Sequence, residues 1–162
     1  MKIILARHSY AEDLTGSNSD ENRILTESGR AVAAEQVQLL VRLAVIPDRI
    51  VASPYKRAQE TAEIFKAALE SVGSIETSVK LAPGYDLMES LDSLVEQSLH
   101  QDQTLLLVGH QPQIGNLALD LLGVPALKIS VSPATLIILD VPNWRRGRAS
   151  LLGMISGDRI KG

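Results

Sequence analysis

Two short runs of consecutive apolar residues, Ile3–Ala6 and Leu105–Val108, constrain the fold more than any other feature of the sequence. Neither run alternates apolar with polar residues, as a strand with one solvent-facing side does. Continuous apolar runs of this length are typical of strands that helices cover on both faces, as in a parallel sheet. The sequence therefore predicts an α/β protein with a buried central sheet.

Strand-like and helix-like segments alternate along the chain. Strands are expected at residues 2–6, 49–52, 77–81, 104–108, 134–141 and 149–155, and helices at 27–44, 54–72, 87–100 and 114–122. Such alternation is typical of crossover units, which build a mainly parallel sheet. A turn-like region at residues 143–147 joins the last two strands, so we expect an antiparallel edge there.

The starts of two helices can be assigned to particular residues. Thr26 offers a side-chain acceptor at the N-cap of the first helix, and Glu27 places a negative charge in its first turn. Ser53 is predicted to cap the second helix, with Pro54 as its first residue and Gly73 at its end. The second helix would then begin directly where a strand ends.

Composition limits the class of protein. A chain of 162 residues is most simply one domain, spanning 1–162, and is long enough to bury a core. The formal net charge of -3 argues against a general nucleic-acid binder. The absence of cysteine excludes disulfides, thiolate nucleophiles and cysteine-ligated zinc. No apolar segment is long enough for a signal peptide or a membrane span, so a cytoplasmic protein that does not bind membranes is expected.

Basic and imidazole side chains follow three of the expected strands. The three junctions are Arg7-His8, Ser53-Pro54-Tyr55-Lys56-Arg57-Ala58 and Gly109-His110. Ligands of open α/β sheets bind at the carboxyl ends of strands, so the three junctions are expected to meet at one edge of the sheet. Arg57, in the first turn of its helix, would direct its guanidinium into that edge, where free backbone N–H groups already favour an anion.

This set of side chains suits phosphoryl transfer. The guanidinium groups of Arg7 and Arg57 can bind phosphate oxygens in a bidentate manner and stabilise the charge on them. A neutral imidazole can attack phosphorus and form a covalent intermediate, which divides hydrolysis into two steps. A second imidazole could donate a hydrogen bond to the same oxygens. This scheme requires no metal ion and no cofactor.

Each signal taken alone also has an ordinary structural interpretation. Most Arg-His pairs are surface residues, Ser-Pro is common at helix starts, and a single His110 would more often be bonded to backbone. The occurrence of all three signals at three strand ends is what favours a shared site. A metallohydrolase is disfavoured because His8 and His110 lack an ordered set of further ligands nearby in the sequence.

Together these residues resemble the histidine phosphatase superfamily. The resemblance rests, in order along the chain, on Arg7-His8-Ser9, Leu25-Thr26 with Gly29, Ser53-Pro54 with Arg57-Ala58 and Thr61-Ala62, and Val108-Gly109-His110. The short length and the Ser-Pro-x-x-Arg-Ala form look most like the small SixA-type phosphohistidine phosphatases. The resemblance implies a three-layer α/β/α sandwich, His8 as the phosphorylated nucleophile, and a phosphate pocket completed by Arg7, Arg57 and His110. Arg23 resembles a further arginine of the family, and the resemblance implies that Arg23 and Ser9 also contact the phosphate.

Two positions depart from the family pattern. Ser9 stands where the family usually has glycine, and it adds a Cβ and a hydroxyl where the backbone nears the phosphate. Larger members carry a glutamate after the third strand, which acts as general acid toward an alcohol leaving group. Residues 81–86 contain no glutamate here. Asp86 is the candidate to replace the general acid, and the alternative is that Asp86 is a solvated residue of a turn.

The missing glutamate bears on the substrate. A phosphoester leaves as an alkoxide and gains much from a positioned acid, whereas a phosphohistidine leaves as an imidazole, which needs little help. The small family members also lack the insertions that cover small substrates. We therefore expect a phosphohistidine phosphatase that acts on a phosphohistidine-bearing protein, such as a phosphotransfer domain, through a phosphorylated histidine of its own. The alternatives are a phosphatase of small phosphomonoesters and a non-catalytic phosphate-binding module.

Overall fold

A computed structural model of the chain describes residues 1–16, 19–69, 72–100 and 103–158. Its strands are β1 (Lys2–Arg7), β2 (Arg49–Ala52), β3 (Glu76–Thr77), β4 (Leu105–Gly109), β5 (Leu136–Asp140) and β6 (Ser150–Ile155). Its helices are α1 (Glu27–Arg42), α2 (Lys56–Ala68), α3 (Leu87–Ser90), α4 (Asp92–His100) and α5 (Gln113–Leu122). Two 3-10 turns, η1 (Asp20–Asn22) and η2 (Val79–Leu81), complete the described elements.

The strands form one sheet in the order β3-β2-β4-β1-β5-β6. The pairs β3–β2, β2–β4 and β4–β1 are parallel, while β5 runs antiparallel to β1 and β6 antiparallel to β5. This arrangement confirms the predicted α/β class, the mainly parallel sheet and the antiparallel edge. No helix in the described part of the chain has the length and apolar character needed to cross a membrane.

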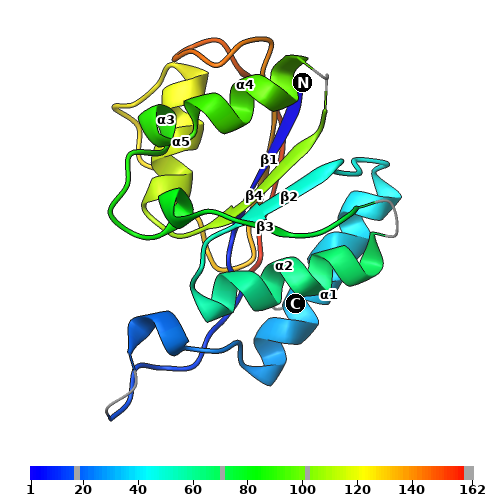
Figure 1. Ribbon diagram of the computed structural model, residues 1–162, viewed down its shortest axis with the longest axis vertical. Helices are drawn as coiled ribbons and strands as arrows, with labels where there is room; N and C mark the ends of the chain where they lie inside the picture. The colour runs from blue at the N-terminus through cyan, green and yellow to red at the C-terminus, as the bar shows by residue number, and fades with distance from the viewer. Residues whose placement is uncertain (17–18, 70–71, 101–102, 159–162) are drawn as a thin grey trace.

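Helices cover both faces of the sheet, with α1 and α2 on one side and α3, α4 and α5 on the other (Figure 1). Alternate residues of β1 enter two separate cores, because successive side chains of a strand point to opposite faces. Ile3 and Leu5 pack in the core on the α3–α5 side, and Ile4 and Ala6 in the core on the α1–α2 side. All residues of the two apolar runs are 0% exposed, which confirms strands covered on both faces.

Two predicted elements are shorter or interrupted. The third strand consists of Glu76–Thr77 alone, and the 3-10 turn η2 occupies most of the remaining predicted range. Both strand residues are exposed, so no apolar burial extends this edge. The helix predicted at 87–100 is divided at Leu91 into α3 and α4. Leu91 is fully buried in the same core as its neighbours, so packing rather than helical continuity fixes the backbone there.

The start and end predicted for the second helix were wrong. Helix α2 begins at Lys56 with Tyr55 at the N-cap, two residues later than Ser53-Pro54 would place it. The Ser53 side chain forms a hydrogen bond with His110 instead of serving as the N-cap. The helix ends at Ala68, well before Gly73, and the N–H of the C-cap residue bonds back to the carbonyl of Lys66.

Candidate active site

The register of the sheet brings the three predicted junctions to one edge. Ala6 of β1 and Ala52 of β2 are both paired with Val108 of β4. His8, Ser53 and His110 therefore leave the sheet at nearly the same level. These three residues and Arg57 are buried, with exposed fractions of 8%, 0%, 3% and 4% in that order. The strand ends thus gather two imidazoles and a guanidinium in a largely desolvated space.

Both ring nitrogens of His8 have defined hydrogen-bond roles. Nδ1 lies 2.7 Å from the carbonyl oxygen of Ser9. A carbonyl oxygen can only accept, so the ring proton is on Nδ1. Nε2 then carries a lone pair, and it accepts a hydrogen bond from Nε of Arg57 at 3.1 Å. This tautomer leaves Nε2 as the nucleophilic atom, facing the guanidinium that would bind the reacting group.

Burial keeps His8 neutral. Desolvation lowers the pKa of His8 to about 3; the hydrogen bond to Ser9 opposes this shift, and the nearby positive charges of His110, Arg57 and Arg7 add to it. An imidazolium has no lone pair on Nε2 and cannot attack phosphorus. The lowered pKa therefore keeps the nucleophile in its reactive form at neutral pH.

His110 presents one free ring nitrogen to the same space. Its Nε2 lies 2.8 Å from the hydroxyl of Ser53, and that hydroxyl accepts a hydrogen bond from the backbone N–H of Tyr55 at 3.3 Å. If the Ser53 hydroxyl donates its own proton to His110 Nε2, the proton of a neutral His110 lies on Nδ1. This Nδ1 is buried and has no hydrogen-bond partner in the described part of the chain. Burial, with the charge of Arg57, lowers the pKa of His110 to about 4.

The two arginines of the inner site differ in how fully they are bonded. Arg7 donates from Nη1 to the carbonyl of Val131 at 2.7 Å, while its Nε is buried without a partner among the described residues. Arg57 donates from Nε to His8, and its Cζ lies 5.0 Å from the centre of the Tyr55 ring. The unpaired Nε–H of Arg7 is a donor that a buried oxyanion would satisfy, and His110 Nδ1 is a second such donor when the ring proton lies there.

Arg57 is also hydrogen bonded to Asp20, a residue that the sequence analysis did not single out. Nη1 of Arg57 donates to the backbone carbonyl of Asp20 at 2.5 Å, and Nη2 donates to Oδ2 of Asp20 at 3.0 Å. The other carboxylate oxygen, Oδ1, accepts from Nη1 of Arg23 at 2.9 Å. Burial acts to raise the pKa of Asp20, but the hydrogen bonds from Arg23 and Arg57 outweigh it and lower the pKa below its ordinary value.

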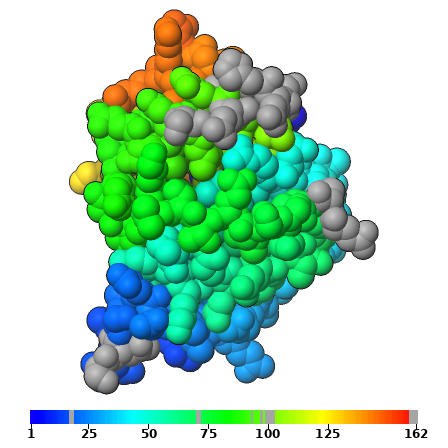
Figure 2. All heavy atoms as spheres, viewed as in Figure 1, coloured from blue at the N-terminus to red at the C-terminus, as the bar shows by residue number. Residues whose placement is uncertain are grey.

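Asp20 and Arg23 form the outer rim of the site. The turn η1, which carries Asp20, lies beside the start of α2 (Figure 1), and this part of the chain projects from one end of the molecule (Figure 2). Arg23 also donates from Nε to the carbonyl of Glu12 at 2.6 Å. Arg23 was predicted to contact the phosphate. In the structure it is linked to Arg57 by the Asp20 carboxylate, which accepts a hydrogen bond from each arginine. The segment that carries Asp20 shows no helical or strand periodicity in the sequence. The contact between Asp20 and Arg57 can therefore be recognised only from the way this segment packs against α2.

The remaining motif residues hold the loop after His8 in place. The Ser9 hydroxyl donates to the carbonyl of Gly29 at 2.6 Å, and the Ser9 N–H donates to Oγ1 of Thr61 at 3.1 Å. A Cβ at Gly29 would lie only 2.0 Å from the carbonyl oxygen of Tyr10, so α1 can approach this loop only with glycine there. Ser9 thus supports the loop, with its hydroxyl and its N–H both bonded to protein groups instead of being left free for phosphate.

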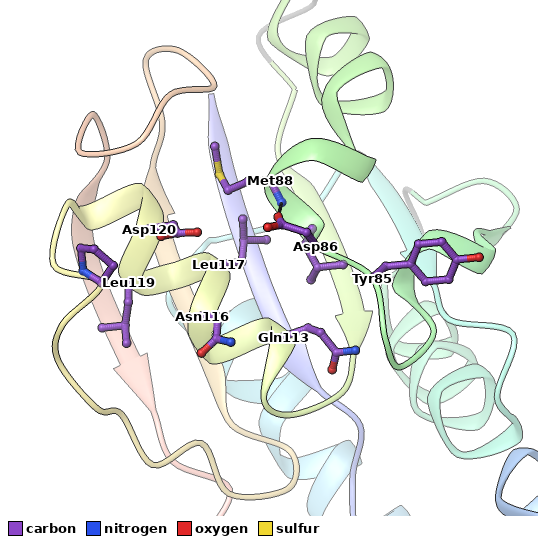
Figure 3. Close-up of a pocket in the computed structure, with 10 residues that line it drawn as sticks. Tyr85, Asp86, Met88, Gln113, Asn116, Leu117, Leu119 and Asp120 are labelled. Atoms are coloured by element: carbon purple, nitrogen blue, oxygen red, sulfur yellow. Dashed lines mark hydrogen bonds between the residues drawn. The ribbon is translucent and has the colours of Figure 1, made fainter.

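Asp86, the candidate general acid, lies in a different setting. Its Oδ1 accepts from the backbone N–H of Met88 at 2.9 Å and of Glu89 at 3.4 Å, which caps α3. It lines a hollow of about 310 Å³ between α3 and α5, next to Gln113 (Figure 3). The residues that line this hollow include none of His8, Arg7, Arg57 and His110. The structure brings the four predicted core residues together, and it gives Asp86 a capping role outside that set.

Comparison with known proteins agrees with the geometry. The profile of the histidine phosphatase superfamily (branch 1) matches residues 3–82. A phosphohistidine phosphatase SixA homolog of Haemophilus influenzae is 34% identical over 146 residues, covering 84% of this chain and 85% of that protein. An uncharacterised protein of Picosynechococcus is 35% identical over 118 residues, covering 73% of this chain and 71% of that protein.

The fold comparison points the same way. The structure of the protein histidine phosphatase SixA complexed with tungstate matches with a TM-score of 0.83, over 97% of both chains, at 22% identity. The two chains therefore share a fold. The relationship to the Haemophilus homolog and the converging histidines and arginines support a phosphatase. The chain belongs to the histidine phosphatase superfamily and is similar to SixA-type members of it.

Proposed function

We propose that this protein removes phosphate from a phosphohistidine on a partner protein, with His8 as the transient phosphate carrier. One observation carries the proposal: Nε2 of a buried, neutral His8 faces Arg57, with its proton held on Nδ1 by the Ser9 carbonyl. This geometry suits nucleophilic attack on phosphorus. It also speaks against a purely phosphate-binding module, since binding alone does not need an imidazole in this tautomer.

In the first step the lone pair of His8 Nε2 forms a bond to phosphorus as the P–N bond of the substrate breaks. The bonding electrons pass to the departing ring nitrogen, and the other ring nitrogen of the substrate histidine keeps its proton. Arg7, Arg57 and Nδ1–H of His110 donate to the phosphoryl oxygens, where negative charge must be stabilised. The Ser9 carbonyl stabilises the positive charge that develops on the His8 ring.

In the second step water attacks phosphorus from the mouth of the site. The P–Nε2 bond breaks, its electrons return to His8, and the proton lost by water leaves with the phosphate or passes to solvent. The arginines supply the charge that a metal ion supplies in other phosphatases. We therefore expect turnover without an added metal ion.

The choice of substrate rests on two supports. The Haemophilus relative is named for phosphohistidine phosphatase activity. In addition, Asp86 caps α3 apart from the imidazoles, and the hydrogen bonds from Arg23 and Arg57 lower the pKa of Asp20. Neither of these two carboxyl groups is therefore suited to protonating an alkoxide. An imidazole leaving group does not need such an acid. A phosphohistidine-bearing phosphotransfer domain is therefore the partner proposed, and a small phosphomonoester is the alternative substrate.

The test is turnover on matched substrates, followed by trapping of the enzyme. The protein is incubated with a phosphotransfer domain phosphorylated on histidine and with a set of phosphomonoesters, each with and without EDTA. We expect faster turnover of the phosphohistidine protein, no effect of EDTA, and acid-labile, base-stable phosphate on His8 after rapid quenching. Preference for the phosphomonoesters would favour the alternative substrate. Loss of activity in EDTA would exclude the metal-independent scheme.

A further inference from the structure

The carboxylate of Asp20 is hydrogen bonded to the terminal end of the Arg57 guanidinium, whose Nε donates to His8. Arg57 gives its Nε to His8 and both terminal nitrogens to Asp20, one to the carboxylate and one to the backbone carbonyl. The side chain of Arg57 is 5% exposed, whereas that of Asp20 is 44% exposed. The guanidinium of Arg57 therefore separates Asp20 from the nucleophile His8. Because Asp20 is partly exposed, a substrate that binds at the mouth of the site can contact it.

The direction of attack defines what Asp20 would meet. In phosphoryl transfer the entering and leaving atoms lie roughly in line on opposite sides of phosphorus. Nε2 of His8 is the entering atom and lies in the buried part of the site. The leaving group lies on the far side of phosphorus from His8, and Asp20 at the exposed rim is a carboxylate that such a group can meet. A carboxylate at this rim can act on the leaving group as well as on the phosphoryl oxygens.

We propose that Asp20 is a specificity-determining residue, whose carboxylate favours a leaving group that carries an N–H and disfavours phosphate esters. The proposal rests on the proposed function, because it concerns the phosphohistidine as substrate of the same site. Each carboxylate oxygen of Asp20 accepts one side-chain hydrogen bond, Oδ2 from Arg57 and Oδ1 from Arg23. Both oxygens therefore retain a lone pair that can accept a further hydrogen bond.

The chemistry of the two leaving groups explains the preference. A phosphohistidine whose remote ring nitrogen is protonated leaves as neutral imidazole: the P–N bond breaks, its electrons stay on the departing nitrogen, and the remote N–H is kept. Asp20 can accept from that remote N–H and keep the proton there until the bond has broken. A phosphate ester has no such donor, and its phosphoryl dianion lacks the positive charge of a protonated ring that would offset repulsion by the carboxylate.

The test compares two leaving groups on one peptide. The native protein and Asp20→Asn are assayed on a peptide phosphorylated on histidine and on the same peptide with phosphotyrosine in that position. Asparagine keeps the size and an acceptor for Arg57 but removes the charge. We expect kcat/KM for the phosphohistidine peptide to fall at least tenfold, with kcat/KM for the phosphotyrosine peptide unchanged or raised. Inhibition by vanadate, which has no imidazole, should be unchanged or stronger.

The matched control is Glu21→Gln, which removes an exposed carboxylate from the neighbouring position of η1 and should change neither substrate. A parallel loss on both peptides together with weaker vanadate inhibition would overturn the proposal, because it would mean that Asp20 only holds Arg57 in position. Equal activity of the native protein and Asp20→Asn on both peptides would overturn it as well. If the native protein fails to dephosphorylate histidine at all, the proposed function fails and this inference falls with it; activity without a change in preference removes the inference alone.

Discussion

The inner and outer parts of the phosphate site are built on different supports. His8 and His110 follow central strands and Arg57 lies in the first turn of α2, and all three side chains are nearly inaccessible to solvent. Asp20 and Arg23 come from η1 and the segment after it, and their side chains are 44% and 24% exposed. The inner part is therefore fixed by the sheet and suited to chemistry. The outer part depends on a surface segment and is suited to choosing among substrates.

The largest expected effect comes from removing the nucleophile of the inner part. His8→Ala should lower turnover of a phosphohistidine substrate by at least about 10³-fold, or about 4 kcal/mol, because no other lone pair faces phosphorus in the proposed scheme. Circular dichroism and thermal unfolding should show an intact fold. Activity within tenfold of the native protein would exclude covalent catalysis by His8.

Substitution of Arg57 and of Arg23 compares the contributions of the inner and outer parts to catalysis. Arg57→Lys removes a planar donor set from a buried site and should cost about 2 to 5 kcal/mol of transition-state stabilisation, measured as a loss in kcat/KM. Arg23→Lys, at the exposed rim, should lower kcat/KM less than about tenfold, or ~1.4 kcal/mol. Equal losses in the two variants would show that the rim contributes to catalysis as much as the interior.

Ser53 tests whether an indirect contact matters in the inner part. Its hydroxyl is the hydrogen-bond partner of His110 Nε2. Ser53→Ala should leave that nitrogen unpaired and change the distribution of the proton between the two ring nitrogens of His110. We expect kcat to fall about tenfold, which corresponds to ~1.4 kcal/mol, with a smaller change in KM. Ser53→Thr, which restores a hydroxyl, should recover part of the loss. A change confined to thermal stability would reduce Ser53 to a packing role.

Asp86 lies outside both parts and should matter least for turnover of phosphohistidine. Asp86→Asn keeps an effective N-cap for α3, so stability should change little. Turnover of a phosphohistidine peptide should fall less than about tenfold, under ~1.4 kcal/mol of barrier. If Asp86 acts as general acid toward esters, the same variant should lose about 10² to 10⁴-fold on phosphomonoesters. A hundredfold loss on phosphohistidine would contradict the account given for the leaving group.

Burial of the two imidazoles should also appear in the pH dependence of stability. The folded-state pKa values, about 3 for His8 and about 4 for His110, lie below those of an unfolded chain. The unfolded state therefore binds protons first as the pH falls below about 6.5, and the folded state loses stability. The midpoint of thermal unfolding should decrease from pH 7 to pH 5, and less steeply in His8→Asn. An identical slope in both proteins would indicate that His8 is more solvated than the structure shows.

Much of the inner part could be predicted because strand ends are visible in the sequence. The buried runs ending at Ala6 and Val108 place Arg7-His8 and His110 at one edge of any parallel sheet in which they are neighbours. The resemblance to a known family then assigned the roles. Helix α2 was placed correctly in type but two residues early, because Ser53-Pro54 has the pattern of a cap whatever its side chain contacts.

Local patterns in the sequence are enough to predict the buried strands, the helices between them, and the basic or imidazole residue at each junction. The packing of the folded chain is needed to show which nitrogen of His8 holds its proton, that Ser53 contacts His110, and that Asp20 is hydrogen bonded to Arg57. These contacts join residues that are close in space through the packing of α1, α2 and η1, and hydrogen-bond direction depends on distances of a few ångströms that no periodicity in the sequence encodes.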